Sequence, residues 1–166
     1  MQHSITTHRV LSLKDALVWR AELRVQGVPL VFTNGHFDLL HIGHLDYLEQ
    51  ASALGGALLV GINDDDATQA LKGDGRPIVP AAERARLIAA LYCVTAAVIF
   101  TGETANDLIS ALQPEIYAKG GDYHHKPLPE RAAVEAYGGR VVLIDLLPNR
   151  STSALIARIR ALPADS

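Results

Sequence analysis

The chain alternates short apolar runs with longer amphipathic stretches, and this alternation constrains its fold more than any other feature. An apolar run of roughly four to eight residues bounded by turn residues is typical of a buried strand. A longer stretch with apolar positions three and four apart is typical of a helix. The expected strands are residues 29–33, 57–62, 97–100, 115–118 and 141–144, and the expected helices are 12–26, 41–54, 81–91, 105–112, 129–137 and one that begins at 151–153.

Strands that alternate with helices predict repeated βα units, in which the strands run parallel and helices cover both faces of the sheet. The predicted architecture is an α/β fold, a Rossmann-like doubly wound parallel sheet of about five strands with an added N-terminal helix. Leu13, Leu17 and Leu23 are expected to form the packed face of that helix, with Trp19 as a further candidate. Residues 1–27 are therefore predicted to be a helical extension, and residues 28–162 to be the sheet domain.

Length, charge and cysteine content limit the partners and the location of the chain. Its 166 residues suit one domain with its own core. A formal net charge of -3 provides no basic field for a nucleic acid, and no run approaches the roughly 20 apolar residues of a membrane span. The single cysteine, Cys93, cannot form an internal disulfide and is expected to be a buried thiol. These properties predict a cytoplasmic protein without a nucleic-acid or membrane partner.

The stretch from Thr33 to His44 carries the strongest indication of chemistry. It follows the first predicted strand and opens the next helix, where open α/β sheets bind ligands and free helix N–H groups attract phosphate. Gly35 and Gly43 permit a close backbone approach. Because His41 and His44 are three residues apart, both imidazoles lie on one side of the first helical turn. They can therefore donate hydrogen bonds to phosphate oxygens.

Other roles for these histidines stay open on the residues alone. A lone histidine more often caps a helix or packs in a core than binds a ligand. A metal would find only two ligands in His-x-x-His, and the expected cysteine or carboxylate partners are not evident nearby. The G-x-G-x-x-G fingerprint and the Walker motif are both absent, which removes the two commonest phosphate loops of α/β proteins.

The run N-G-H-F-D-L-L-H-I-G-H at residues 34–44 resembles the nucleotide-binding signature of the cytidylyltransferase-like nucleotidyltransferases, including its HxGH core. The resemblance implies that His41 and His44 act in catalysis by contacting a triphosphate from which pyrophosphate leaves. His36 stands where the closest subfamily commonly has cysteine. Asp38 is expected to face the acceptor substrate as well as the nucleotide. The implied nucleotide-binding residues of this motif are Thr33, Asn34, Gly35, His36, Phe37, Asp38 and Gly43.

A charged loop at residues 72–77, with the sequence K-G-D-G-R-P, precedes Arg84. Taken alone, its glycine, aspartate and proline residues are equally typical of a solvated surface loop. The loop is similar to the K-G-x-x-R-P element of the heptose-phosphate adenylyltransferases. That likeness implies that Lys72 meets phosphates during catalysis and that Arg84 supports the triphosphate side.

A glycine-containing element, K-G-G-D-Y, follows the fourth predicted strand. Two glycines allow an unusual backbone path, and a plain glycine turn with solvated charges would explain the element too. The same subfamily has a closely similar sequence, which implies contact with the acceptor substrate. The implied substrate-binding residues are Lys119, Gly120, Gly121, Asp122 and Tyr123.

The run S-T-S opens the last predicted helix. Hydroxyl groups at a helix start cap its free N–H groups, and capping alone would explain the run. The place matches the family's S-T-[ST] motif, and the resemblance implies that Ser151, Thr152 and Ser153 contact the nucleotide. Arg150 is not a clear counterpart of the arginine in the cytidylyltransferase version.

The resemblance implies in-line attack by an acceptor phosphate on the α-phosphorus of the nucleotide. Because that phosphate is ionised at neutral pH, positioning and charge stabilisation are expected to carry catalysis. The closest subfamily implies transfer of AMP from ATP to D-glycero-D-manno-heptose 1-phosphate, which gives pyrophosphate and ADP-heptose for lipopolysaccharide biosynthesis. Mg²⁺ is expected to be held by phosphates and water rather than by a protein cage.

Alternative functions stay open. The chain could be a cytidylyltransferase that acts on glycerol 3-phosphate or a similar alcohol phosphate. It could also be a non-catalytic nucleotide-binding regulatory module, and a metal-binding protein ranks last. The family further suggests a homodimer. Because 166 residues leave no room for a sugar kinase, a kinase is expected to be a separate pathway partner.

Overall fold

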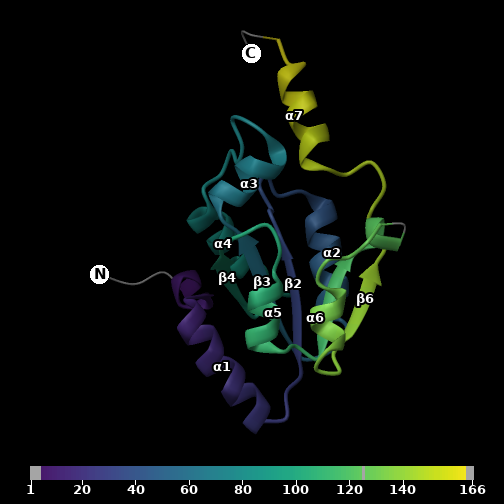
Figure 1. Cartoon of the computed structure of the whole chain (residues 1–166). Coiled ribbons are helices and arrows are strands. Elements are labelled where there is room, and N and C mark those ends of the chain that lie inside the picture. Colours follow the sequence, from purple (N-terminus) through teal and green to yellow (C-terminus); the bar gives the residue numbers. More distant parts are fainter. Residues whose placement is uncertain (1–4, 125, 164–166) are drawn as a thin grey trace.

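The computed structural model describes residues 5–124 and 126–163, and it contains a six-stranded parallel sheet with helices on both faces (Figure 1). The strand order is β1-β4-β3-β2-β5-β6. The predicted doubly wound α/β fold is confirmed, with one strand more than expected. The strands are β1 (Val10–Leu11), β2 (Leu30–Gly35), β3 (Ala57–Asn63), β4 (Ala96–Phe100), β5 (Ile116–Gly120) and β6 (Arg140–Ile144).

The sheet reverses its winding direction at β2. From β2 the chain moves outward through β3 and β4, and it then crosses to the other side of β2 to form β5 and β6. The crevice between the carboxyl ends of β2 and β5 is thus the switch point at which open α/β sheets bind ligands. The strand order by itself therefore predicts a ligand site in this crevice.

The additional strand, β1, is only two residues long. It pairs in parallel with β4, with Val10 opposite Ala97 and Leu11 opposite Val98. Two residues are too few to display a strand period, so the sequence pattern contains no signal for β1. Pairing with the edge of an existing sheet is what makes this segment a strand.

The helices form two layers around the sheet. One apolar cluster joins α1, α5 and α6 to one face, and a second joins α2 and α4 to the other face. Figure 1 shows α1, α5 and α6 together in front of the sheet. The helices are α1 (Leu13–Val25), α2 (Ile42–Ser52), α3 (Asp65–Lys72), α4 (Ala81–Ala90), α5 (Asn106–Leu112), α6 (Arg131–Glu135) and α7 (Thr152–Arg160), with 3-10 turns η1 (Ile5–Arg9) and η2 (Gly121–His124).

The packed face of the N-terminal helix α1 was predicted only in part. Leu13 and Leu17 are 50% and 37% exposed, whereas Leu23 and Arg20 are buried. Arg20 is inside because its Nε donates a 2.9 Å hydrogen bond to the carbonyl of Leu112 at the end of α5. An apolar pattern cannot anticipate a buried arginine, so the prediction identified Leu23 correctly and missed Arg20.

Cys93 lies in the turn between α4 and β4 and is half-buried, so the prediction of a buried thiol was wrong. Burial still raises the pKa of this thiol. Among the described residues, no helix has the length and apolarity that crossing a bilayer requires.

The C-terminal helix α7 projects away from the sheet, and none of its nine residues is buried (Figure 1).

Candidate active site

A cavity of about 320 Å³ opens at the carboxyl ends of β2 and β5, beside the switch point of the sheet. Its walls come from the end of β2, the start of α2, the end of α3, the end of β5 and the segment that leads into α7. Segments that are far apart in sequence therefore share one cavity. The predicted site residues that line it are Asn34, Gly35, His36, Phe37, Asp38, His41, Gly43, His44, Lys72, Lys119, Gly120, Tyr123, Ser151, Thr152 and Ser153.

Four predicted site residues do not line the cavity as described. Thr33 is buried behind it, with Oγ1 2.6 Å from the hydroxyl of Tyr47. Arg84 is fully buried and donates hydrogen bonds to the carbonyls of His36 and Val79. Gly121 lies just beyond the lining, in η2. The side chain of Asp122 lies outside the described residues.

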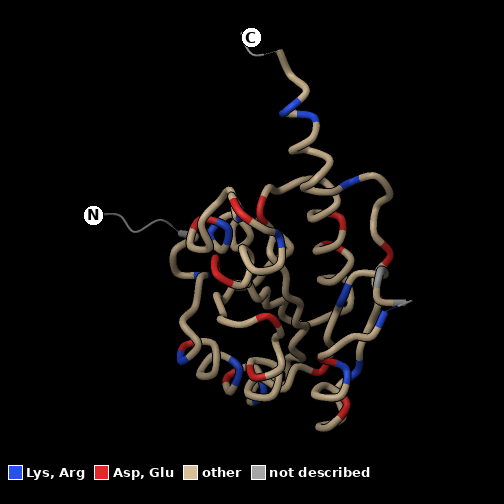
Figure 2. Tube along the Cα trace, turned by 45° about the horizontal axis from the view of Figure 1, so that its top comes forward, with Lys and Arg blue, Asp and Glu red and all other residues tan. Residues whose placement is uncertain are grey.

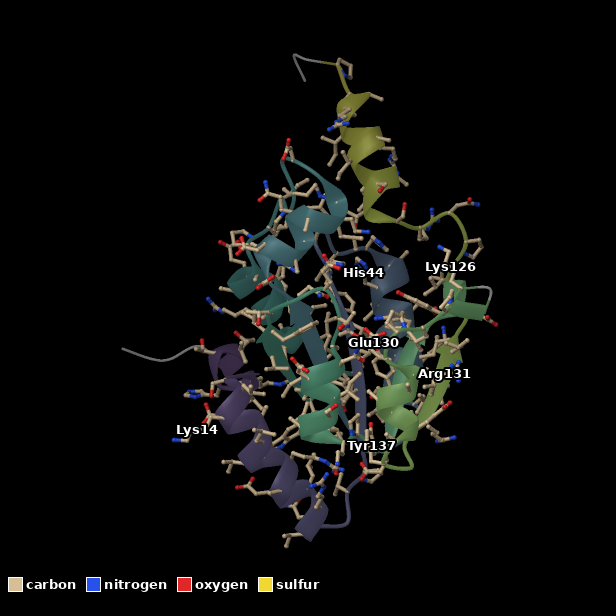
Figure 3. All side chains as sticks on the ribbon, in the orientation of Figure 1. Lys14, His44, Lys126, Glu130, Arg131 and Tyr137 are labelled. Carbon is tan, nitrogen blue, oxygen red and sulfur yellow. The ribbon has the colours of Figure 1, made fainter. Side chains whose placement is uncertain are left out.

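The two histidines of the HxGH run lie against each other. His41 is the N-cap residue of α2 and His44 belongs to its first turn, and their rings stack with centroids 3.8 Å apart. Figure 3 shows His44 at the end of the sheet from which α7 leaves. A Cβ on Gly43 would lie 3.0 Å from His41 Nδ1 and 3.1 Å from the Cβ of Arg150. Glycine at this position therefore lets the histidine pair and the α7 segment meet.

Both imidazoles are neutral at neutral pH. Burial, followed by the charge of His41, lowers the pKa of His44 to about 4, and burial also lowers the pKa of His41. Neither Nδ1 atom has a hydrogen-bond partner among the described residues, although both atoms are buried. Anionic phosphates in the cavity would raise both pKa values, because an opposite charge favours the protonated form.

The backbone between β2 and α2 is held in an unusual conformation at Phe37. Its φ angle is 45°, in the left-handed region that few non-glycine residues adopt. The ring is buried and meets the ring of His44 edge-on at 5.2 Å. A Cβ on Gly35 would lie 2.9 Å from this ring, so glycine makes room for it. Phe37 thereby supports the orientation of His44.

Asp38 connects the first motif to the charged loop. Its Oδ2 accepts a 2.7 Å hydrogen bond from Arg76 Nε, and its Oδ1 accepts the backbone N–H groups of Ile78 and Val79 at 2.8 and 2.9 Å. Burial opposes ionisation of Asp38, but these N–H groups and Arg76 outweigh it and lower the pKa. Asp38 is thus an ionised anchor for residues 76–79, and both of its oxygens are engaged within the fold.

The cavity is positively charged although the chain is not. Lys72, Arg76, Lys119 and Arg150 all line it. Lys119 Nζ is 3.0 Å from Asn34 Oδ1, which holds the ammonium group at the end of β2. Over the rest of the fold Figure 2 shows basic and acidic residues interspersed. A cavity lined by several cations, on a chain whose other charges are of mixed sign, suits a polyphosphate ligand.

A family model described as cytidylyltransferase-like matches residues 32–158, which is most of the chain. The chain belongs to the cytidylyltransferase-like family. The matched region includes every wall of the cavity, from the end of β2 to the start of α7.

Named relatives of this cytidylyltransferase-like chain include both short and long proteins. The D-beta-D-heptose 1-phosphate adenylyltransferase of Bordetella bronchiseptica is 49% identical over 133 residues, which cover 80% of this chain and 82% of that protein. The bifunctional protein HldE of Syntrophotalea carbinolica is 43% identical over 164 residues, which cover 95% of this chain. The chain spans only about one third of the length of such bifunctional relatives, since the match covers 34% of that protein.

A solved structure shares the fold. It is the crystal structure of the lipopolysaccharide core biosynthesis protein from Thermoplasma volcanium GSS1, which superposes with a TM-score of 0.59. The two sequences are 26% identical, and the match covers 73% of this chain and 98% of the other. The cytidylyltransferase-like architecture therefore extends across sequences that differ at most positions.

Further residues line the cavity of this cytidylyltransferase-like chain that were not predicted from the sequence. Tyr47 stands three residues after His44 on α2, so helical spacing could have identified it. Arg76 belongs to the K-G-D-G-R-P loop itself. Leu146 and Leu147 form an apolar wall after β6 and belong to no motif. Their position depends only on how the chain returns toward α7.

Proposed function

We propose that this chain transfers AMP from ATP to D-glycero-D-manno-heptose 1-phosphate, which yields ADP-heptose and pyrophosphate. The observation that carries the proposal is the convergence of the stacked pair His41 and His44 with Lys72 and Lys119 in one cavity at the switch point of the sheet. A family relative whose printed name is D-beta-D-heptose 1-phosphate adenylyltransferase supports the choice of acceptor.

The triphosphate is assigned to the start of α2, where His41 and His44 donate hydrogen bonds to phosphate oxygens. Lys72 approaches the same phosphates from the end of α3, and the segment 151–153 approaches from the start of α7. Free N–H groups and a positive dipole end at two helix starts add to this attraction. The remaining nucleotide-side residues are Thr33, Asn34, Gly35, His36, Phe37, Asp38, Gly43 and Arg84.

The acceptor is assigned to the β5 side of the cavity, with Lys119 as its main cation. Asp38 contributes by anchoring the loop at 76–79, and Arg84 by holding the carbonyl of His36 and the carboxylate of Asp65. Both are positioning residues in this proposal. The remaining substrate-side residues are Gly120, Gly121, Asp122 and Tyr123.

The reaction is a direct in-line displacement. An oxygen of the sugar phosphate bonds to the α-phosphorus of ATP, and the bond from that phosphorus to the pyrophosphate oxygen breaks. No covalent intermediate is required, because the nucleophile is already ionised. Catalysis then comes from alignment of the two phosphates and from the stabilisation of charge on the departing pyrophosphate by preorganised donors.

Mg²⁺ is expected to enter with the nucleotide. The described residues contain no group of three histidine, cysteine or carboxylate side chains that could hold a metal ion. Asp38 is the only carboxylate among the described residues that line the cavity, and both of its oxygens are engaged. Phosphate and water oxygens would therefore be the ligands, and the metal would neutralise part of the triphosphate charge.

The proposed activity also sets a cellular context. A sugar kinase must supply the sugar 1-phosphate, and ADP-heptose would serve lipopolysaccharide biosynthesis in the cytoplasm. The proposal includes a homodimer, which light scattering of the purified chain would test. Both substrates are small molecules, in keeping with the size of the cavity.

The test is pyrophosphate release with Mg²⁺, with ATP and CTP each supplied alongside heptose 1-phosphate or glycerol 3-phosphate. Release confined to ATP with the heptose phosphate is the expected result. Release with CTP and glycerol 3-phosphate would retain the chemistry and overturn the substrates. Tight nucleotide binding without release in any combination would indicate a non-catalytic binding module.

A further inference from the structure

His36 is held in one tautomer by its neighbours. Its Nδ1 is 2.9 Å from the hydroxyl oxygen of Thr68 on α3. The hydroxyl of Thr68 donates its own hydrogen to the carbonyl of Asp64, at 2.7 Å. A hydroxyl has a single hydrogen, so Thr68 can only accept from His36. The proton of the neutral imidazole therefore resides on Nδ1, and Nε2 presents a lone pair.

The surroundings keep this imidazole neutral. Burial is the main cause, and the charges of Lys72, Arg84, Lys119 and Arg76 add to it, so that the pKa of His36 falls to about 4. Asp65 on α3 is engaged with Arg84 at 2.7 Å. At neutral pH the ring is therefore a hydrogen-bond acceptor on its Nε2 side.

The Nε2 atom is available to a ligand. His36 lines the cavity, and among the described residues its Nε2 has no hydrogen-bond partner. Nε2 of His36 is not one of the buried side-chain nitrogens without a partner, unlike Nδ1 of His41 and His44, so this unpartnered atom is accessible. An accessible acceptor nitrogen that lies near four cationic side chains is best matched by a ligand group that can donate a hydrogen bond. Fully ionised phosphates cannot donate, whereas the hydroxyls of ribose and of a sugar can.

We propose that His36 is a specificity-determining residue whose Nε2 accepts a hydrogen bond from a hydroxyl of the bound ligand. The proposal rests on the proposed function, which supplies two sources of that hydroxyl: the ribose of the nucleotide and the sugar of the acceptor. His36 would thus not only line the cavity but also make a polar contact with the ligand.

Two substitutions separate this role from a structural one. His36→Asn keeps a donor at the position of Nδ1, which preserves the bond to Thr68, and leaves no atom at the position of Nε2. His36→Gln can place a carbonyl oxygen near the position of Nε2 and gives up the bond to Thr68. The proposal predicts that the Gln variant retains more hydroxyl selectivity than the Asn variant. A purely structural His36 predicts the opposite order.

The experiment is isothermal titration calorimetry on the full chain. The nucleotide arm uses ATP, 2′-deoxyATP and 3′-deoxyATP, and the acceptor arm uses heptose 1-phosphate and its analogues that each lack one hydroxyl. In one arm the wild-type chain is expected to bind the parent ligand about 10-fold to 100-fold more tightly than one deoxy analogue. A ratio of affinities of this size is typical when a polar group is left without its partner. His36→Asn should bring that ratio close to one, and His36→Gln should keep part of it. The arm that responds identifies the source of the hydroxyl.

Equal selectivity in the wild-type chain and His36→Asn would overturn the proposal, as would stronger selectivity in the Asn variant than in the Gln variant. Absence of any hydroxyl selectivity in both arms would overturn it too. Pyrophosphate release is measured separately. A chain that releases none but shows selectivity dependent on His36 would contradict the proposed function and support the role of His36.

Discussion

Three histidines around one cavity share a physical property: burial makes their protonated forms unfavourable. Burial is the largest cause of the lowered pKa of His36, His41 and His44. Nearby lysine and arginine charges add to the effect at His36, and the charge of His41 adds to it at His44. The site thus holds neutral donors and acceptors before a ligand arrives. Binding of polyphosphate would change that balance, because anions stabilise imidazolium.

Replacing His44 tests the role of the histidine pair. We expect His44→Asn to lower kcat/KM by about 100-fold or more, the loss typical of removing one preorganised donor to a developing charge. The free energy of unfolding should change by about 1 kcal/mol or less, since among the described residues neither ring nitrogen of His44 makes a hydrogen bond. Activity and urea unfolding are measured together, with the exposed His8→Asn as the matched control. A large loss of stability with normal specific activity would assign His44 to the core instead.

The lowered pKa values also predict how stability depends on pH. His36 and His44 titrate at about 4 in the folded chain, whereas histidine in an unfolded chain titrates near 6.5. As pH falls, the unfolded state takes up these protons first. The stability that the neutral histidines contribute is therefore fully present above pH 6.5 and is lost as pH falls from 6.5 to about 4.

Urea midpoints measured across this pH window would check the prediction. The double variant His36→Asn, His44→Asn should show a shallower decline than the wild-type chain. Carboxylates such as Asp38, whose pKa is lowered, also lose stabilisation in acid, and they do so equally in both proteins. Parallel declines in the two proteins would contradict the neutral state of the histidines.

At the scale of elements, the site depends on segments that hold one another in place. The loop at 76–79 has no regular structure, and Asp38 fixes it through one ion pair and two backbone N–H groups. Arg84 joins α4 to α3 through Asp65 at 2.7 Å and to the end of β2 through the carbonyl of His36. Arg76 is therefore positioned by Asp38, and the helix that carries Lys72 is tied to α4 by Arg84.

The anchor at Asp38 can be tested directly. Asp38→Asn removes the charge that Arg76 pairs with, and we expect it to lower the free energy of unfolding by about 2–4 kcal/mol, as for other broken buried pairs. The Kd of ATP should rise, because Arg76 lines the cavity. Asp74→Asn, at an exposed position in the same loop, is the control and should leave both quantities near the wild-type values. A weaker ATP affinity without loss of stability would indicate that Asp38 contacts the ligand.

At the scale of the whole molecule, the two ends of the chain contribute differently. The N-terminal segment completes the sheet through β1 and buries Leu23 and Ala16 in an apolar cluster. The guanidinium of Arg20 caps the end of α5, with Nη2 2.9 Å from the carbonyl of Gln113. By contrast, α7 lies outside both apolar clusters. Stability is therefore expected to depend on the first end and ligand binding on the second.

Two truncations test this contrast. Removal of residues 1–27 exposes an apolar cluster and the edge of β4, and we expect loss of the cooperative thermal transition. A chain that ends at Ala154 keeps Ser151, Thr152 and Ser153, and its Tm should stay within about 4 °C of the full-length value. Circular dichroism melts compare the two. A stable fragment lacking residues 1–27 would support the predicted division into a helical extension and an independent domain.

Local patterns in the sequence were sufficient for most of the fold and for the location of the site. Buried strands such as β2 and β3 appear as continuous apolar runs because helices cover both of their faces. The cap at Ser151 follows from side-chain chemistry within four residues, and its hydroxyl accepts from Ala154 N at 3.1 Å. Motifs at strand ends fall beside one another because the carboxyl ends of parallel strands meet at one edge. These features depend on short stretches of chain.

The sequence by itself thus determined the winding of the sheet and the edge at which the candidate site lies. Tertiary structure alone decided the strand at β1, the buried face of α1 and the tautomer of His36. Each depends on a partner distant in sequence: Val10 pairs with Ala97, Arg20 meets a carbonyl 92 residues away, and His36 meets Thr68 32 residues away. The conformational preferences of short stretches of sequence cannot predict such contacts, because burial and charge compensation exist only after the segments have come together.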